Sequence, residues 1–375
     1  MLTLVTAFLI AAVANLLLIR FSHLHENLTG DFAPGPQKVH TGNIPRIGGV
    51  GILLGILVAG VTPWFRPDTG KPELIYLMAV VSLPAFISGL CEDITKRVPP
   101  WVRLLGAVVS AVLGMVILGA AIKRVGFSDM TALVELWPVT FLLTALAVAG
   151  MAHAVNIIDG FNGLSAGVAL LILFAIAYVA FRVGDLGLFH LCVASGGAVL
   201  GFLIWNYPAG LMFLGDGGAY LLGVVIAESC ILLVMHNPQV SPWFSLLVVI
   251  YPTVETIFTI YRRLLVHRSS PGAPDALHLH SLIYRRLLSW ALSSKLEARA
   301  LVRRNSMTAL YLWGLTGLCI IPAVIFYNKT YVLLGCVVAF AAFYIWLYAC
   351  IVKFRTPVWL RRLFQMKRYQ DLSMK

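Results

Sequence analysis

The chain has 375 residues, of which 60% are apolar and 12% are charged. Soluble domains are about 45–50% apolar, even with glycine counted, and about 25% charged. These figures exclude a disordered protein, an ordinary soluble enzyme and a nucleic-acid-binding protein that depends on a high charge density. Together with a mean hydropathy of +0.89, they indicate a polytopic membrane protein. In a membrane protein, a net charge of +12 indicates how the chain is oriented in the bilayer and that its basic residues contact anionic lipid. We therefore expect no nucleic-acid partner.

Eleven apolar stretches approach the ~20 residues that a helix needs to cross a bilayer. We expect helices because open strands cannot satisfy their backbone in lipid, and these stretches are too long and continuous for barrel strands. The first stretch has no basic segment before it and is followed by Arg20, which favours a retained span over a cleaved signal peptide. The predicted spans are 2–20, 47–65, 74–91, 101–121, 137–155, 164–182, 187–205, 211–235, 243–261, 309–327 and 331–352.

The basic residues predict the orientation of these spans. Eleven spans place the termini on opposite sides and divide the connections into two sets. One set holds 22 of the 28 Lys and Arg residues, and the other holds six. Because basic loops stay in the cytoplasm, we expect a periplasmic N-terminus and a cytoplasmic C-terminus. The predicted fold is therefore an all-α integral membrane protein of about eleven spans, in a bacterial inner membrane.

Residues 1–375 are interpreted as a single polytopic membrane domain. Its longest hydrophilic segment is the cytoplasmic loop 262–308, and a basic tail follows from 353 to 375. Residues 281–304 alternate apolar with basic side chains at helical spacing, which favours an amphipathic helix on the inner leaflet. Six cysteines lie singly, mostly within apolar stretches, and are interpreted as small buried hydrophobic residues.

The first two cytoplasmic connections carry polar groups of two kinds. Lys38 and His40 precede a glycine pair at 48–49, which either lets the backbone approach a ligand closely or simply turns the chain. Glu92 and Asp93 are adjacent at the end of an apolar span. Two carboxylates there are costly unless a cation or a proton relieves them. They are either a metal or general-base pair, or an interfacial cluster with the basic residues that follow.

The third connection has the sequence NIIDGFNGL over 156–164. Its polar residues Asn156, Asp159 and Asn162 recur three apart and would share a face if the segment were helical. The fourth connection has Asn206 and then FLGDGG over 213–218. Asp216, between glycines and apolar stretches, suits a hard cation such as Mg²⁺, although it could also cap the next helix.

The fifth connection contains His278 and His280 among arginines. Their spacing does not match a zinc site on a helix, so imidazoles that face a phosphate or a nucleotide are one interpretation and solvated side chains are the other. All these carboxylates and histidines fall on the face selected by the basic residues, at span ends. Transporters and proton relays would place such groups near mid-depth. The pattern favours phosphoryl transfer on a lipid phosphate at the cytoplasmic face.

The ordered motifs KVHTGNIPRIGG, CED, NIIDGFNGL, NYPAGLMFLGDGG and HLH, spread over 38–280, resemble the polyprenyl-phosphate N-acetylhexosamine-1-phosphate transferases. This is glycosyltransferase family 4, which includes the phospho-MurNAc-pentapeptide translocase and WecA-type enzymes. The resemblance implies transfer of a sugar 1-phosphate from a UDP-sugar to undecaprenyl phosphate, with release of UMP. It also implies Mg²⁺, for which Mn²⁺ could substitute. Membrane lipids are expected partners, and a homodimer is compatible with the resemblance.

The resemblance also implies roles for individual residues. Asp216 matches the principal metal-binding aspartate, and Glu92 with Asp93 matches an aspartate pair near the lipid phosphate. Asp93 is expected to act as the base, with Glu92 as its support, or to help hold the metal. Asp159 is expected to belong to the catalytic set. The residues expected to contact substrate are Lys38, His40, Asn156, Asn162, Asn206, Phe213, His278 and His280.

Three departures from the family pattern favour a WecA-like enzyme over the translocase. The acidic pair begins with Glu92, Ser281 stands where a third histidine is common, and Asn162 replaces an aspartate of the translocase. Such enzymes begin surface-polysaccharide repeat units of the O-antigen or capsule type. The alternative is a transporter or flippase, which would need charges at mid-depth. Only Glu228 and Glu255 lie well within spans, and the sequence shows no basic partner for either.

Overall fold

The computed structural model describes residues 1–30, 44–65, 71, 73–266, 277–288 and 298–353. The described chain is helical throughout, apart from connecting segments and one isolated bridge between Gly30 and Pro45. Lys38, His40 and most of the basic tail lie outside the described residues, so their predicted roles stay predictions.

The predicted all-α membrane fold is confirmed. Within the described ranges, ten helices are long and apolar enough to cross a bilayer, or eleven if one bent pair counts as a span. The helices that form these spans, the last pair of which before α15 is the bent one, are α1 (Leu2–Arg20), α3 (Gly48–Ala59), α4 (Glu73–Thr95), α5 (Pro100–Leu113), α7 (Trp137–Ile158), α8 (Leu164–Val183), α9 (Leu186–Asn206), α10 (Gly215–His236), α11 (Pro242–Val248), α12 (Ile250–Tyr261), α15 (Ala298–Ile325) and α16 (Thr330–Val352).

Shorter elements continue or connect these helices. They are η1 (Ser22–Leu24), α2 (Glu26–Thr29), η2 (Thr62–Phe65), η3 (Gly114–Leu118), α6 (Ser128–Val134), η4 (Arg262–Val266), α13 (Leu279–Leu282) and η5 (Ile283–Leu288). The amphipathic helix predicted over 281–304 is only partly described: its start falls in α13 and η5, and its end is the first turns of α15. The residues between 289 and 297 lie outside the described ranges.

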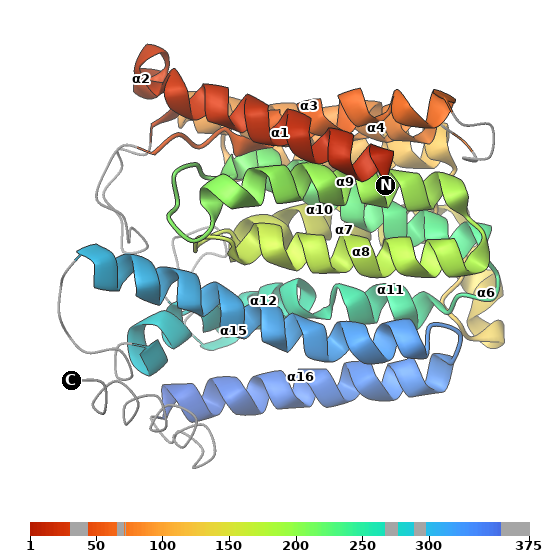
Figure 1. Ribbon diagram of the computed structural model, residues 1–375. Coiled ribbons are helices and arrows are strands. Elements are labelled where there is room, and N and C mark those ends of the chain that lie inside the picture. Colours follow the sequence, from red (N-terminus) through yellow and green to blue (C-terminus); the bar gives the residue numbers. More distant parts are fainter. Residues whose placement is uncertain (31–43, 66–70, 72, 267–276, 289–297, 354–375) are drawn as a thin grey trace.

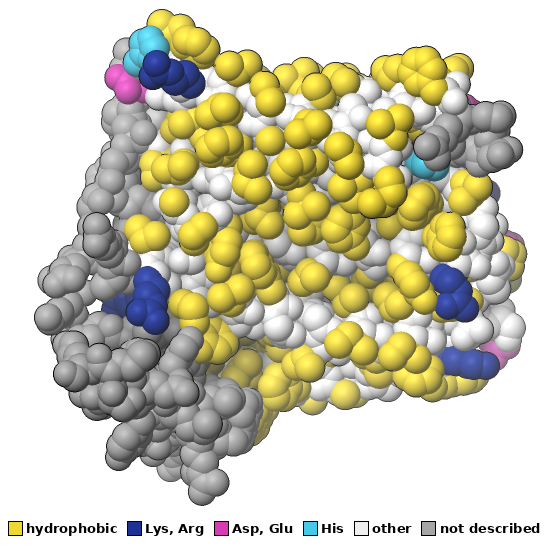
Figure 2. Space-filling view, in the orientation of Figure 1, with side chains coloured by type: hydrophobic (Ala, Val, Ile, Leu, Met, Phe, Trp, Pro, Cys, Tyr) yellow, Lys and Arg dark blue, Asp and Glu magenta, His cyan; other side chains and the backbone are white. Residues whose placement is uncertain are grey.

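The helices form a bundle in which the predicted functional loops meet at one end (Figure 1). Helices α1, α3 and α4 lie along one side, α7, α8, α9 and α10 lie in the middle, and α11, α12, α15 and α16 lie along the other side. Apolar side chains cover the long flank seen in Figure 2, and the charged side chains visible there lie towards the two ends. This distribution is the one expected of a multi-pass membrane protein.

Helix α10 is the central element, and every residue from Gly215 to Val234 is buried. Small residues allow this close packing: a β-carbon on Gly223 would lie 2.4 Å from Ala152 Cα, and one on Gly49 would lie 2.3 Å from Gly218 Cα. Small residues at helix contacts are typical of membrane bundles, where backbones approach closely. The glycine pair at 48–49 therefore brings α3 against α10. Its predicted close approach to a ligand stays a prediction.

The predicted span 243–261 is not one straight helix. It is broken at Val249 into α11 and α12, which are bent by 73°. Pro252 explains the break, because proline has no N–H to donate to the carbonyl of Val248 and its ring clashes with that carbonyl. The bend turns the last half of this span, which carries Glu255, towards α13 and α16.

Candidate active site

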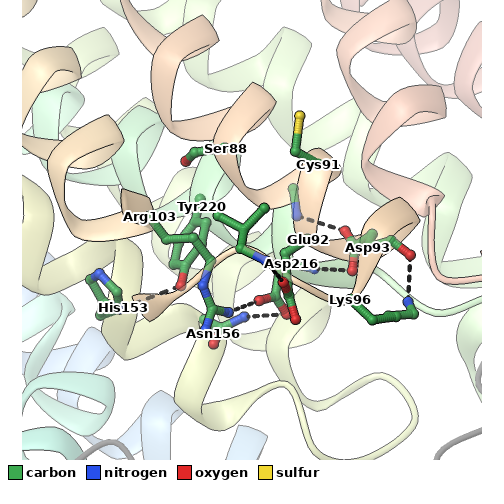
Figure 3. A network of polar contacts seen from close by, with 12 residues as sticks. Ser88, Cys91, Glu92, Asp93, Lys96, Arg103, His153, Asn156, Asp216 and Tyr220 are labelled. Carbon is green, nitrogen blue, oxygen red and sulfur yellow. Dashed lines mark hydrogen bonds and ion pairs between the residues drawn. The ribbon is translucent and has the colours of Figure 1, made fainter. Parts of the chain in front are cut away.

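Asp216 lies at the centre of the polar cluster, at the start of the buried helix α10 (Figure 3). Its Oδ1 accepts hydrogen bonds from Asn156 Nδ2 at 3.0 Å and from Arg46 Nη2 at 3.3 Å. Its Oδ2 forms an ion pair with Arg103, at the start of α5. The carboxylate is 9% exposed, so these partners balance its charge where little water reaches it.

Gly215 makes the turn into α10 that presents Asp216. Its φ of +76° belongs to the left-handed region, which favours glycine. A β-carbon there would lie 2.2 Å from the carbonyl oxygen of Arg46 and 2.5 Å from Asp93 Oδ2. No other residue fits this position, because both the backbone conformation and the space exclude a side chain.

Asp93 holds the first turn of α10 from the neighbouring helix α4. Its Oδ1 accepts from the backbone N–H of Asp216 and its Oδ2 accepts from that of Gly217, both at 2.9 Å. A carboxylate at this place satisfies amides that the helix itself cannot pair and faces the positive end of the helix dipole. Asp93 is 1% exposed. This geometry makes it an anchor for the turn, and its expected role as a base or metal ligand stays a prediction.

Glu92, the other half of the acidic pair, is half-buried. Its Oε2 accepts from the backbone N–H of Val98 at 2.7 Å, across a turn in which Lys96 has a φ of +56°. The Lys96 ammonium group donates to the backbone carbonyl of Asp93. Of the two adjacent carboxylates, Glu92 is thus the one that a substrate can approach.

Asp159 follows the last residue of α7 and lies near the same cluster. Burial raises the pKa of its carboxyl from the usual 3.8 to about 7, and the nearby charges of Asp216 and Asp93 add to this rise, whereas Arg46 opposes it. A carboxyl with such a pKa can exchange a proton near neutral pH, which is a property of functional sites.

Asn162 and Asn206, both expected to contact substrate, are buried between two loops, and their expected contact with substrate stays a prediction. Asn206 Oδ1 accepts from the N–H of Gly163 at 2.6 Å, and its Nδ2 donates to the carbonyl of Met212 at 2.7 Å. Asn162 Nδ2 donates to the carbonyl of Pro208 at 3.0 Å. These amides join the loop after α7 to the loop before α10. They therefore hold together the two loops that carry Asp159 and Asp216.

His278 and His280 lie beside the loop that carries Asp159. Their rings stack with centroids 5.1 Å apart, and both residues are buried. A β-carbon on Gly160 would lie 3.2 Å from His280 Nε2. The pair is therefore not solvated, contrary to the second interpretation of the sequence. Phe213, half-buried, contributes its backbone: its carbonyl accepts from the N–H of Gly48 at 3.0 Å.

Sequence reasoning missed the two arginines of the cluster. Arg46 and Arg103 were assigned only to the basic faces of the membrane, yet both pair with Asp216. The sequence did contain a clue to the role of Arg103, because this residue lies inside an apolar span, one turn after Pro99 and Pro100. A charge within a span normally needs a partner in the bundle.

Comparison with known proteins agrees with this arrangement. Residues 75–234 match the family described as glycosyl transferase family 4. The predicted resemblance is confirmed. The matched segment contains the acidic pair, the loop at 156–164 and Asp216, whereas His278 and His280 lie beyond its end.

Relatives of two kinds are similar to this chain. A probable undecaprenyl-phosphate N-acetylglucosaminyl 1-phosphate transferase of Bacillus subtilis (strain 168) is 29% identical over 273 residues, which cover 70% of this chain and 71% of that protein. The undecaprenyl-phosphate alpha-N-acetylglucosaminyl 1-phosphate transferase of Escherichia coli (strain K12) is 28% identical over 67% of this chain and 68% of its own length. A phospho-N-acetylmuramoyl-pentapeptide-transferase of Geobacillus kaustophilus is 34% identical over 50% of this chain and 60% of that protein.

Proposed function

We propose that this protein transfers an N-acetylhexosamine 1-phosphate from a UDP-sugar to undecaprenyl phosphate. The products are a polyprenyl-diphosphate-linked sugar and UMP. The family match and the names of the relatives support the reaction type and the lipid acceptor. The observation that carries the proposal for this chain is the pairing of Asp216 with Arg46 and Arg103 at one end of an apolar bundle. Carboxylate and guanidinium groups together suit a diphosphate and its counter-ion.

The chemistry is a displacement at phosphorus. An oxygen of the lipid phosphate attacks the β-phosphorus of the UDP-sugar, a new P–O bond forms, and the bond from the β-phosphorus to the bridging oxygen breaks. That oxygen leaves with UMP. The guanidinium groups of Arg46 and Arg103 are placed to attract the diphosphate and to balance charge on the departing UMP. We assign to Glu92 the removal of any proton left on the lipid phosphate, because it is more accessible than Asp93.

Magnesium fits this donor set through Asp216. Within the described ranges, no group of three or more His, Cys, Asp or Glu residues could hold a metal by itself. Mg²⁺ is usually bound by one or two carboxylates together with substrate phosphates, so a single well-placed carboxylate suffices. Asp216 would hold the ion, with Asp159 nearby, and the ion would withdraw charge from the diphosphate. Asp93 suits this role less, since its oxygens accept backbone amides of α10, whereas the partners of Asp216 are side chains.

The remaining assignments follow from the same scheme. The predicted cytoplasmic orientation would bring the cluster to the side where UDP-sugars occur, and reporter fusions after residues 96, 160 and 280 test it against fusions after 68 and 126. Lys38, His40, Asn156, His278 and His280 would bind the nucleotide and diphosphate. The proposed location is a bacterial inner membrane, and the proposed pathway is surface-polysaccharide synthesis.

The test of function uses purified protein in lipid nanodiscs, undecaprenyl phosphate and a panel of radiolabelled UDP-sugars. We expect lipid-linked radioactivity with one or more UDP-N-acetylhexosamines, and its loss on chelation of Mg²⁺ with recovery on re-addition. Asp216→Asn should remove turnover although asparagine caps a helix as well as aspartate does. Near-normal product formation by Asp216→Asn across Mg²⁺ concentrations would contradict the proposed metal ligand.

Isotope exchange tests the direct route. Direct attack by the lipid phosphate requires no covalent enzyme intermediate, so labelled UMP should enter the UDP-sugar only when lipid acceptor or lipid product is present. Exchange in delipidated enzyme would indicate instead that a carboxylate attacks first.

A further inference from the structure

Glu255 is a buried carboxylate that the reaction scheme above does not use. It lies in α12, six residues after the break at Val249, and is 1% exposed. Removing a charged carboxylate from water is costly unless it is paired and hydrogen-bonded. The sequence shows no partner for Glu255, whereas the structure gives it three.

The first partner is the His278 side chain. Its Nδ1 lies 3.0 Å from Glu255 Oε1, and the two groups form a buried pair. The same carboxylate oxygen accepts from the backbone N–H of Leu279 at 3.2 Å. Because an ionised carboxylate only accepts hydrogen bonds, the Nδ1 atom carries the proton. Glu255 therefore fixes both the ring of His278 and the backbone that follows it.

The second carboxylate oxygen is also occupied. Tyr344, from α16, donates its hydroxyl hydrogen to Glu255 Oε2 at 2.8 Å and is fully buried. The next turn of α16 holds the same segment, since the Tyr348 hydroxyl donates to the carbonyl of Leu277 at 3.1 Å. Two helices thus hold the histidine segment in place from the interior of the bundle.

The contacts continue from His278 to the proposed active site. His278 stacks on His280 with an angle of 16° between the ring planes, and His280 meets the edge of Phe161 at 5.4 Å between centroids. His280 also lies beside Gly160, the residue after Asp159, where a β-carbon would lie 3.2 Å from its Nε2. A continuous set of contacts therefore runs from Tyr344 through Glu255 and the two imidazoles to the loop that carries Asp159.

We propose that Glu255 is a positioning residue for sugar-nucleotide binding, because it fixes the ring orientation in which His278 meets a phosphate oxygen. The Nδ1–H group of His278 is donated to Glu255, so the ring can donate a hydrogen bond to an anion only through Nε2. It can do so only as an imidazolium, and the Glu255 carboxylate then balances the positive charge of the ring. The geometry follows the logic by which an acidic partner orients a functional histidine. This inference rests on the phosphate-binding role proposed above for His278.

Glu228 provides a matched control. It is the other glutamate deep within a span, in α10, and it is fully buried. Its carboxylate faces Gly114 at the start of η3, where a β-carbon would lie 2.2 Å from Glu228 Oε1. Since the described contacts do not connect it with the histidine segment, Glu228→Gln makes the same side-chain exchange in a buried span without touching His278.

The experiment measures kcat and KM for the UDP-sugar and for undecaprenyl phosphate, with the thermal midpoint, for purified full-length variants in nanodiscs. We expect Glu255→Gln to raise KM for the UDP-sugar about tenfold or more, as loss of a hydrogen bond to a charged group would. KM for the lipid should change less than about twofold. Glu255→Asp, which keeps the charge, should recover part of the loss, and Glu228→Gln should match the wild type in all three kinetic constants.

A double-mutant cycle separates positioning from simple packing. Because Glu255 acts through His278, the kinetic effect of Glu255→Gln should vanish in a His278→Ala background. If Glu255→Gln does not fold, Tyr344→Phe, which deletes one hydroxyl, enters the same cycle and should show the same dependence on His278. Independent, multiplicative effects would overturn the positioning role while leaving the role of His278 intact. Normal kinetics in His278→Ala would refute the proposed phosphate-binding role, and with it the inference.

Discussion

Asp93 Oδ1 lies 2.9 Å from the backbone nitrogen of Asp216, so one acidic residue of the site holds the turn that presents the other. The two residues come from α4 and α10, more than 120 positions apart in sequence. A β-carbon on Gly89, one turn before Asp93, would lie 2.6 Å from the Asp216 carbonyl carbon, so the backbones also touch. The position of Asp216 is thus set by Asp93 and by a helix contact that admits no side chain.

The first prediction separates the two members of the acidic pair. Asp93→Ala removes both acceptors at the start of α10 and should lower the thermal midpoint by about a degree or more, because a lost cap costs about 1 kcal/mol or more. Activity should fall with it. Glu92→Gln removes a more accessible carboxylate and should lower kcat with little change in the midpoint. Thermal unfolding and initial rates of the same preparations check both outcomes; an Asp93→Ala protein as stable as the wild type would contradict the anchoring role.

The second prediction concerns Arg103, whose side chain is 16% exposed and pairs with Asp216. Arg103→Met keeps most of the apolar length but leaves the carboxylate with one charged partner fewer. We expect kcat/KM for the UDP-sugar to fall about tenfold to hundredfold, as for loss of a charge-assisted hydrogen bond. Arg97→Met, at an exposed position in the preceding connection, is the control and should keep near-normal rates. Equal effects of the two substitutions would show that only the total charge matters.

The sequence predicted the fold well because span length and apolar composition reflect the thickness of a bilayer. The sequence also predicted that the carboxylates lie at one end of the bundle, since successive spans alternate in direction and so determine which connections lie on the same side. It could not predict that Pro252 would break a span, because proline is also tolerated in straight membrane helices.

The detailed roles depended on three-dimensional contacts. Asp93 and Asn206 have the residue types of ligands, but their partners are backbone groups. Nothing in the local sequence distinguishes a carboxylate that caps a distant helix from one that binds metal. The sequence likewise indicates no partner for Glu255. His278 lies 23 residues away in the chain, and the two side chains meet only because the span is bent.

The third prediction follows from the raised pKa of Asp159, about 7 against a usual 3.8. Between these values the folded protein holds a proton that the unfolded chain has lost, so the contribution of Asp159 to stability falls as pH rises from about 4 to 7. Above pH 7 the unfavourable contribution is constant. Asp159→Asn should therefore raise the thermal midpoint of metal-free protein by a few degrees at pH 8 and by less at pH 5.5.

Two comparisons complete that prediction. Asp159→Asn should be nearly inactive at every pH if the ionised carboxylate is required. Asp129→Asn, at an exposed position in α6, should not change the dependence of the midpoint on pH. A stabilisation by Asp159→Asn that is the same at both pH values would show that desolvation of the charge is not its cause.

The last prediction concerns the space between Gly160 and the histidine pair. A methyl group at Gly160 would lie 3.2 Å from His280 Nε2, so the imidazole would have to move by a few tenths of an ångström. Because His280 stacks on His278, both rings should shift, and we expect Gly160→Ala to raise KM for the UDP-sugar while KM for undecaprenyl phosphate stays near its original value. Gly150→Ala, in the middle of α7, places the same methyl group where no atom lies within 4 Å and should leave both constants unchanged. Steady-state kinetics in nanodiscs check the pair, and an unchanged KM in Gly160→Ala would show that the histidines need not contact this loop closely during nucleotide binding.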